Sequence, residues 1–154
     1  MMISQWIKNK MKLVLSIVLV LCTSSLFSNE INFQTAKLYK ADISAKQAYE
    51  LQQKGALLID VRTKKEFEQL RAKDSYNIPI FYEKNKQRVF NKNFSNEIYS
   101  YTKKNLNKRI ILICRSGSRT KLASNLLAYQ GFTNIYNVKY GFTYDWIKQK
   151  LPTQ

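Results

Sequence analysis

Short apolar runs alternate along the chain with amphipathic stretches that begin at helix-capping residues. Residues 57–59 and 110–113 are apolar without alternation, which is typical of strands buried on both faces of a parallel sheet. Ser44 and Thr63 each stand three residues before a glutamine or glutamate, an arrangement that caps the start of a helix. The alternation predicts an α/β fold whose mainly parallel sheet is covered by helices on both faces.

The same pattern predicts where each element lies. The predicted elements are, in order, a strand around 37–39, a helix over 44–54, a strand over 56–61, a helix over 63–71, a strand over 76–78, a helix over 95–106, a strand over 110–113, a helix over 120–129, a strand over 135–138 and a helix over 142–150. Residues 80–93 are aromatic and basic without a clear period, and the pattern assigns no element to them.

Residues 1–28 have the pattern of a secretory signal peptide. Three lysines precede a short apolar run, and small polar residues follow it. We expect cleavage after Ser28, a leader over 29–42 and one domain over 43–151, in the periplasm or secreted. The apolar run is short for a membrane span, so membrane contact is expected only through this segment if it is retained. Lipid attachment at Cys22 is an alternative, although a leucine precedes it where a small residue is expected.

The chain is strongly basic and contains no histidine. It carries 26 Lys and Arg against 10 Asp and Glu, a net charge of +16 that falls to +13 without the three lysines of the predicted signal. The lysines are spread among polar and aromatic residues, and no nucleic-acid-binding motif is present. We therefore expect a solvated cationic surface and no nucleic-acid partner. The charge favours encounters with small anions.

Cys114 carries the strongest chemical signal, because it stands at the carboxyl end of a predicted buried strand, where open α/β sheets bind ligands. Loop N–H groups and the positive end of the next helix favour an anion there, so we expect a nucleophilic thiolate. The alternative is a small buried hydrophobe, the usual place of a free cysteine. Without the signal peptide Cys114 is the only cysteine, which excludes an internal disulfide. The loop residues expected to bind substrate are Arg115, Ser116, Gly117, Ser118 and Arg119.

Four motifs in succession resemble the rhodanese family of sulfurtransferases, over residues 43–146. They are Leu57-Leu58-Ile59-Asp60-Val61-Arg62-Thr63 with Glu66-Phe67, Asn77-Ile78-Pro79-Ile80, the loop from Cys114 to Arg119, and Gly131-Phe132 with Ile135-Tyr136-Asn137-Val138, Gly141 and Trp146. Residues 70–75 depart from the Gly-His-Ile-Pro-Gly-Ala turn usual in that family, and Tyr140 replaces the first glycine of its closing pair. These departures are expected to alter the rim of the pocket.

The resemblance implies a thiosulfate sulfurtransferase in which Cys114 becomes a persulfide. A small anionic donor would give up one sulfur atom, and a thiol or cyanide would accept it, with no metal or other cofactor and with the protein acting as a monomer. Loop N–H groups would hold the outer sulfur, and Arg115 would hold the sulfonate of the donor. Arg119 would brace the loop or add positive potential. Asp60 would either receive loop N–H groups or serve as a strand-end turn carboxylate.

Loop length separates sulfur transfer from phosphate chemistry. Four residues lie between Cys114 and Arg119, whereas cysteine phosphatases have five and would place the arginine at Thr120. A shorter loop closes around a single sulfur atom instead of a tetrahedral phosphate. The resemblance also implies that Arg62 and Glu66 form a structural pair. The remaining alternative is a non-catalytic or carrier module that passes persulfide sulfur to a specific partner protein, or binds one.

Overall fold

The computed structural model describes residues 30–154, of which Asn32–Gln154 form one compact unit. The predicted signal peptide and Cys22 lie outside the described residues. The strands are β1 (Ala41–Ile43), β2 (Leu57–Asp60), β3 (Tyr76–Asn77), β4 (Phe81–Lys84), β5 (Gln87–Phe90), β6 (Ile110–Ile113) and β7 (Ile135–Val138). The helices are α2 (Ala45–Gln53), α3 (Lys64–Gln69), α4 (Phe94–Tyr101), α5 (Ser118–Tyr129) and the short π-helix η1 (Phe142–Trp146). None of the helices within residues 30–154 is long and apolar enough to cross a membrane.

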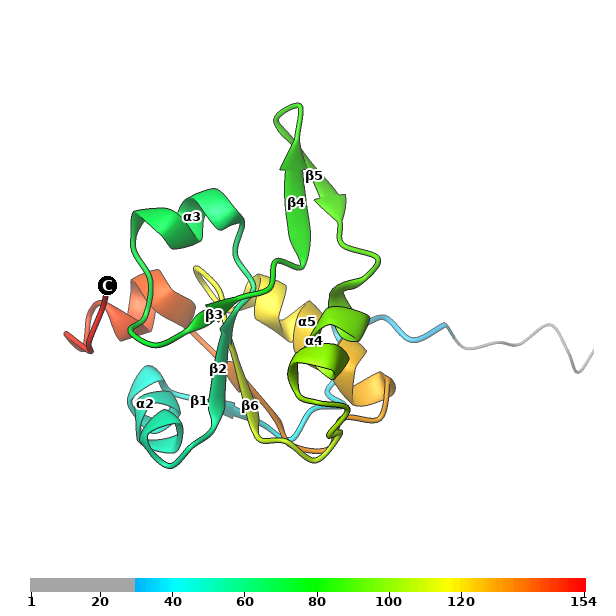
Figure 1. Ribbon diagram of the computed structural model, residues 1–154, viewed down its shortest axis with the longest axis horizontal. Coiled ribbons are helices and arrows are strands. Elements are labelled where there is room, and N and C mark those ends of the chain that lie inside the picture. Colours follow the sequence, from blue (N-terminus) through cyan, green and yellow to red (C-terminus); the bar gives the residue numbers. More distant parts are fainter. Residues whose placement is uncertain (1–29) are drawn as a thin grey trace, which may run out of the picture. The chain divides into compact units, whose positions relative to one another are not determined.

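Five strands form a parallel sheet in the order β1-β7-β6-β2-β3 (Figure 1). Leu58 lies opposite Ile111 and Ile59 opposite Leu112, so alternate residues of each strand face opposite sides. Ile59 and Leu112 pack with α4 and α5 on one face of the sheet. Leu58 and Ile111 pack with α2 and η1 on the other face. The predicted α/β fold, with helices on both faces of a mainly parallel sheet, is confirmed.

Both predicted capping boxes form. The Gln47 N–H donates to the Ser44 hydroxyl at 3.2 Å, and the Ser44 N–H donates to the Gln47 side chain at 2.9 Å. At the start of α3, the Glu66 N–H donates to the Thr63 hydroxyl and the Thr63 N–H donates to the Glu66 carboxylate. Each box satisfies two backbone N–H groups that a helix start leaves unpaired. These two helices therefore begin where the sequence predicts.

The predicted leader lies against α5 through one fully buried side chain, Asn125. The Asn125 amide donates to the carbonyl oxygens of Phe33 and Ala36, both at 2.8 Å, and its Oδ1 accepts from the Leu38 N–H at 2.7 Å. The strand predicted around Leu38 is therefore wrong, because this backbone is bound by a side chain of α5. The first strand, β1, begins three residues later, where the chain pairs with β7.

Two predicted helices are shorter than expected. The helix α4 ends at Tyr101, because Lys103 and Lys104 adopt positive φ values of 53° and 63° that a helix cannot continue. The C-terminal helix is a single π-turn closed by the Ile147 N–H, which donates to the Phe142 carbonyl at 2.9 Å. This turn brings the start of η1 against the loop that follows β6.

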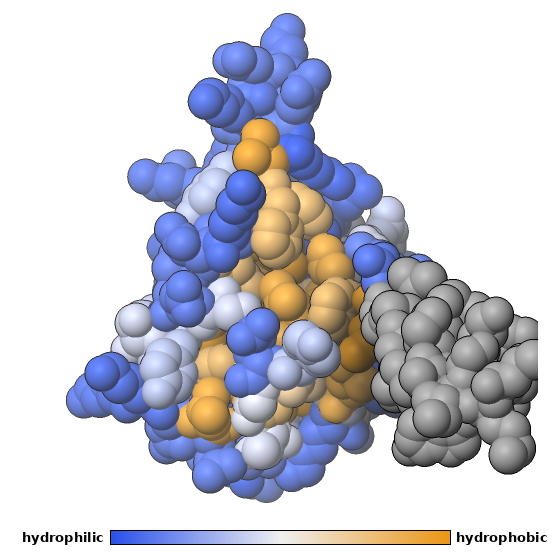
Figure 2. All heavy atoms as spheres, turned by 90° about the vertical axis from the view of Figure 1, so that its right-hand side faces the viewer, coloured by the Kyte–Doolittle hydropathy of each residue, from blue (hydrophilic) through white to orange (hydrophobic). Residues whose placement is uncertain are grey.

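The stretch that carries no sequence signal contains the hairpin β4-β5, which projects from the sheet in Figure 1. Asn85 and Lys86 form its two-residue turn with φ values of 52° and 61°. Such turns favour Asn-Gly, and here Lys86 stands where the glycine is expected, so the turn signature is incomplete. At its base the rings of Phe81 and Phe90 meet edge to face at 5.9 Å. In Figure 2 the tip of the hairpin is hydrophilic. Apolar surface begins below this tip and extends down the same side of the molecule.

Candidate active site

Cys114 directly follows β6, the central strand, at the carboxyl edge of the sheet. Its side chain is fully buried, and its thiol is free. The Gly117 N–H donates to Sγ at 3.2 Å, and the Thr120 hydroxyl oxygen lies 3.5 Å from Sγ. Both residues belong to the beginning of α5, so the positive end of a twelve-residue helix lies beside the sulfur. This environment favours a negatively charged sulfur.

The carbonyl side of the loop is bound by the start of η1. The Phe142 N–H donates to the Cys114 carbonyl at 2.7 Å, and the Thr143 N–H donates to the Arg115 carbonyl at 3.0 Å. The close approach depends on Gly141, which has φ +68° and on which a Cβ would lie 2.4 Å from the Cys114 carbonyl oxygen. The glycine thus lets two distant parts of the chain fix the curvature of the loop.

Gly117 is the turning point of the loop. Its φ of +91° lies in the region that favours glycine. A Cβ at this position would lie 1.8 Å from the Lys139 carbonyl oxygen, at the end of β7. The N–H that reaches the sulfur of Cys114 is therefore held by close backbone packing as well as by the local turn.

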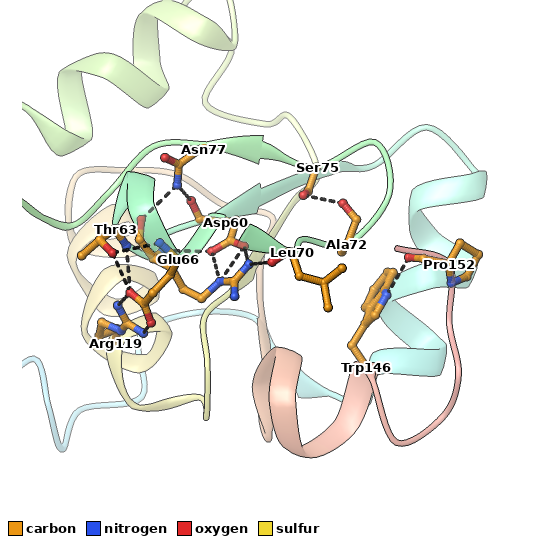
Figure 3. Close-up of polar contacts among 11 residues, drawn as sticks. Asp60, Thr63, Glu66, Leu70, Ala72, Ser75, Asn77, Arg119, Trp146 and Pro152 are labelled. Atoms are coloured by element: carbon orange, nitrogen blue, oxygen red, sulfur yellow. Dashed lines mark hydrogen bonds and ion pairs between the residues drawn. The ribbon is translucent and has the colours of Figure 1, made fainter. Parts of the chain in front are cut away.

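Arg119 braces the loop through a bidentate ion pair with Glu66 (Figure 3). Its two terminal nitrogens each lie 2.7 Å from a carboxylate oxygen. The carboxylate also accepts from the N–H and hydroxyl of Thr63, at 3.1 and 3.0 Å. Burial alone would raise the pKa of Glu66, but the hydrogen bonds and charge of Arg119, with the bonds from Thr63, lower it to about 2. Arg119 was expected either to brace the loop or to add positive potential. These contacts match the first of the two roles.

The low pKa of Glu66 predicts that its contribution to stability depends on pH. The folded state favours the carboxylate, so the contribution is full above the ordinary value of 4.5 and is lost as the pH falls from there towards 2. We expect Glu66→Gln to lower the free energy of unfolding by about 2 kcal/mol at pH 7, allowing for partial exposure, and by much less at pH 3. Urea unfolding at both pH values measures this.

Glu68→Gln is the matched control for that measurement. Glu68 lies on the same helix, is exposed, and stands 3.6 Å from Lys64. Exposed pairs of this kind contribute about 0–1 kcal/mol, so we expect a small change at either pH. A loss of stability in Glu66→Gln that stayed constant from pH 7 to pH 3 would contradict the ion-pair account.

Asp60 is fully buried and binds Arg62 instead of the loop after β6. Its carboxylate accepts from the Arg62 N–H at 2.9 Å and from Nε at 2.9 and 3.0 Å. The backbone contact two residues ahead is that of a turn carboxylate, which was one of its two expected roles. The other expected role does not occur, because Arg62 occupies the carboxylate. The expected pairing of Arg62 with Glu66 is wrong, since the capping bond to Thr63 turns Glu66 towards α5.

The remaining loop residues differ in exposure. Arg115 and Ser118 are exposed, Ser116 is half-buried, and Cys114 is enclosed. A substrate would therefore meet the loop on the side of its exposed residues. Among residues 30–154, no three Cys, Asp or Glu side chains gather closely enough to hold a metal ion. The sequence does not predict Thr120 as a neighbour of the sulfur. In the sequence its position mattered only as the place where a cysteine phosphatase would have its arginine.

The family model for rhodanese-like domains matches residues 44–148. The chain belongs to this family. RP600, an uncharacterized protein of Rickettsia prowazekii, is 34% identical over 108 residues, which are 64% of this chain and 83% of RP600. Thiosulfate sulfurtransferase 16, a chloroplastic protein of Arabidopsis thaliana, is 31% identical over 114 residues, which are 74% of this chain and 92% of that protein. Sulfur transfer is thus supported at the level of the family.

A solved structure supports the same fold. The crystal structure of Rv0390 from M. tuberculosis superposes with a TM-score of 0.62 at 24% sequence identity. The match covers 75% of this chain and 98% of the other. At this identity the likeness concerns the fold alone.

In this rhodanese-like domain, the segment that departs from the usual family turn, residues 70–75, is held by the C-terminal tail. Arg71 and Gln154 exchange two backbone hydrogen bonds at 3.0 Å. The Trp146 ring is fully buried and donates through Nε1 to the Pro152 carbonyl at 2.9 Å (Figure 3). The tail thus supports a turn that contains neither glycine nor proline.

Proposed function

We propose that this protein moves one sulfur atom from thiosulfate or a related small anionic donor to a thiol or cyanide, through a persulfide on Cys114. One observation carries the proposal: the sulfur of Cys114 lies at the end of the central strand, within 3.2 Å of a loop N–H and beside the start of α5. This is the geometry expected for stabilising a sulfur anion. The family match and the relative named as a thiosulfate sulfurtransferase support it.

The proposed reaction is a double displacement through a covalent intermediate. The Cys114 thiolate attacks the outer sulfur of thiosulfate, the S–S bond of the donor breaks, and sulfite leaves with the electron pair. Loop N–H groups stabilise the persulfide anion that remains. An acceptor thiolate or cyanide then bonds to the outer sulfur, and the electron pair of the Cys114 S–S bond returns to Sγ. The chain has no histidine, so the loop and the helix end must stabilise the thiolate without a neighbouring imidazole.

The mass of the purified protein tests this proposal. After incubation with thiosulfate and removal of the excess, we expect the intact mass to rise by one sulfur atom, and to return to its initial value after addition of cyanide. Protein first alkylated with iodoacetamide is the control, because its sulfur is blocked. An unchanged mass after thiosulfate treatment would overturn the thiosulfate reaction.

Arg115 is proposed to hold the sulfonate of the donor, since it is exposed on the open side of the loop. One charge-assisted bidentate contact contributes about 1.5–3 kcal/mol, so Arg115→Ala should raise the KM for thiosulfate about 10- to 150-fold. Discharge of a preformed persulfide by cyanide should change little, because no sulfonate takes part in that step. The measurement compares steady-state KM with single-turnover discharge.

Arg88→Ala is the control for Arg115→Ala, since Arg88 is an exposed arginine on β5, away from the loop. If the net charge of the protein alone attracted the donor, both variants would show the same rise in KM. Equal damage to loading and discharge in Arg115→Ala would show that this residue shapes the loop instead of binding the donor.

We also propose that the protein acts as a monomer after export to the periplasm or beyond. The support for export is the pattern of residues 1–28, with its three lysines, apolar run and small polar residues. The excess of positive charge in the remaining chain would favour encounter with an anionic donor.

A further inference from the structure

Thr120 places a hydroxyl between two acceptors beside the sulfur. Its side chain is fully buried in the first turn of α5. The hydroxyl donates to the Gly117 carbonyl at 2.8 Å, and its oxygen lies 3.5 Å from Sγ of Cys114. A hydroxyl has one hydrogen to donate, so it can serve only one of the two acceptors at a time.

The Gly117 carbonyl does not depend on this hydroxyl. It also accepts the Lys121 N–H at 3.1 Å, the regular bond that begins α5. A hydroxyl that turned away from this carbonyl would therefore leave no buried acceptor unpaired. The hydroxyl of Thr120 is free to rotate between the two acceptors at little cost, because one of them keeps another donor.

We propose that Thr120 is a positioning donor whose hydroxyl follows the charge of Cys114, a role that rests on the proposed function of this site. When Cys114 is neutral or carries the outer sulfur, the hydroxyl donates to the Gly117 carbonyl. When Sγ is an anion, the hydroxyl rotates to donate to it, together with the Gly117 N–H. Hydrogen bonds to charged groups are about twice as strong as neutral ones, which favours the rotation.

The Thr120 hydroxyl is expected to accelerate discharge of the persulfide more than it accelerates loading. The acceptor thiolate bonds to the outer sulfur, the bond between the outer sulfur and Sγ breaks, and its electron pair stays on Sγ. Negative charge therefore develops on Sγ in the transition state, where the Thr120 hydroxyl can donate to it. No proton has to be transferred, and no oxidant or reductant is needed. In the loading step the same bond makes the thiolate more abundant but less nucleophilic, so the two effects partly cancel.

Two charged groups near the loop, Arg119 and Asp60, are already paired and do not replace this donor. The guanidinium of Arg119 is bound to both carboxylate oxygens of Glu66. The carboxylate of Asp60 is bound by Arg62. Replacement of Thr120 leaves both pairs in place, so a change in the behaviour of Sγ reports on the hydroxyl.

Thr120→Val and Thr120→Ser separate this role from a purely structural one. Valine keeps the shape of threonine and removes the hydroxyl, whereas serine keeps the hydroxyl. We expect Thr120→Val to slow single-turnover discharge of a preformed persulfide by cysteine about 10-fold, and loading by thiosulfate about 3-fold. Thr120→Ser should stay within about 2-fold of the wild type in both steps. A threonine that only closed the turn would not affect the two steps differently.

Ser124→Ala is the matched control. Ser124 lies one turn further along α5, is fully buried, and its hydroxyl has no hydrogen-bond partner among the described residues. Its loss should leave both steps unchanged, although it also removes a buried hydroxyl from the same helix. Discharge by Thr120→Val at the wild-type rate, or equal slowing of both steps, would overturn the proposal.

A second measurement needs no sulfur donor and so separates failure of this inference from failure of the proposed function. At one fixed pH, the ultraviolet absorbance of the Cys114 thiolate in the reduced protein should be weaker in Thr120→Val than in the wild type. Equal absorbance would overturn the role of Thr120 even if thiosulfate loads the enzyme. A weaker thiolate signal in a protein that thiosulfate fails to load would support Thr120 and refute the donor.

Discussion

Replacing Cys114 with serine should abolish sulfur transfer completely, with no added sulfur after thiosulfate treatment and no turnover above background. A serine hydroxyl is not ionised near neutral pH and is a far weaker nucleophile than a thiolate. The N–H of Gly117 and the helix end would still be present, but no sulfur would be there to receive the transferred atom. Intact-mass measurement and a cyanide-coupled assay both read this outcome.

Cys22→Ser is the matched control, because Cys22 and Cys114 are the two cysteines of the sequence. In the full chain it should leave both the mass gain and the turnover unchanged. The fold of Cys114→Ser is checked separately by its urea unfolding curve, since the side chain is fully buried. A Cys114→Ser variant that still gained sulfur would move the chemistry to another group and refute the persulfide mechanism.

Gly117→Ala should reduce sulfur transfer at least about 100-fold, because the active loop can no longer close. The added Cβ would lie 1.8 Å from the Lys139 carbonyl oxygen, although real Cβ contacts essentially never fall below 3.0 Å. The backbone of the loop or of Lys139, just after β7, must therefore move by more than an ångström, and the N–H that reaches Sγ moves with it. The measurement is the single-turnover rate of loading and discharge.

Gly55→Ala distinguishes steric collision from backbone strain. Gly55 has a φ of +83°, close to that of Gly117, but a Cβ there would meet nothing within 4 Å. Both variants carry the strain of a left-handed alanine, about 1–2 kcal/mol, and only Gly117→Ala collides with other backbone, that of Lys139. Gly55→Ala should therefore lose stability and keep its activity. Comparable activity in the two variants would show that the contact with Lys139 does not hold the loop.

The parts of the fold that the sequence predicts are those with local causes. The runs at Leu57–Ile59 and Ile110–Ile113 become neighbouring strands because unbroken apolar runs need cover on both faces, and a strand between two layers of helices has it. Ser44 and Thr63 begin helices because their capping bonds close within three residues. The hairpin at 81–90 could not be predicted, since its turn consists of two non-glycine residues in left-handed conformations.

The candidate site is only partly local. Strand, cysteine and loop are consecutive, so the position of Cys114 at the sheet edge was predictable. The partners of the charged residues were not, because Glu66 meets Arg119 across 53 positions of sequence. The contact of Gly141 with the Cys114 backbone depends in the same way on how η1 returns to the loop. Such contacts depend on how whole helices and strands are arranged in space, so they cannot be predicted from the conformational preferences of single residues.

The hydrogen bonds of Asn125 limit how many residues can be removed from the N-terminal side of the domain. A chain beginning at residue 44, where the family match starts, would lose Phe33, Ala36 and Leu38, leaving a buried amide unpaired at a cost of about 1–3 kcal/mol per group. It would also lose β1, so the edge of β7 would become an open template for aggregation between molecules. A soluble fragment should therefore begin no later than residue 32.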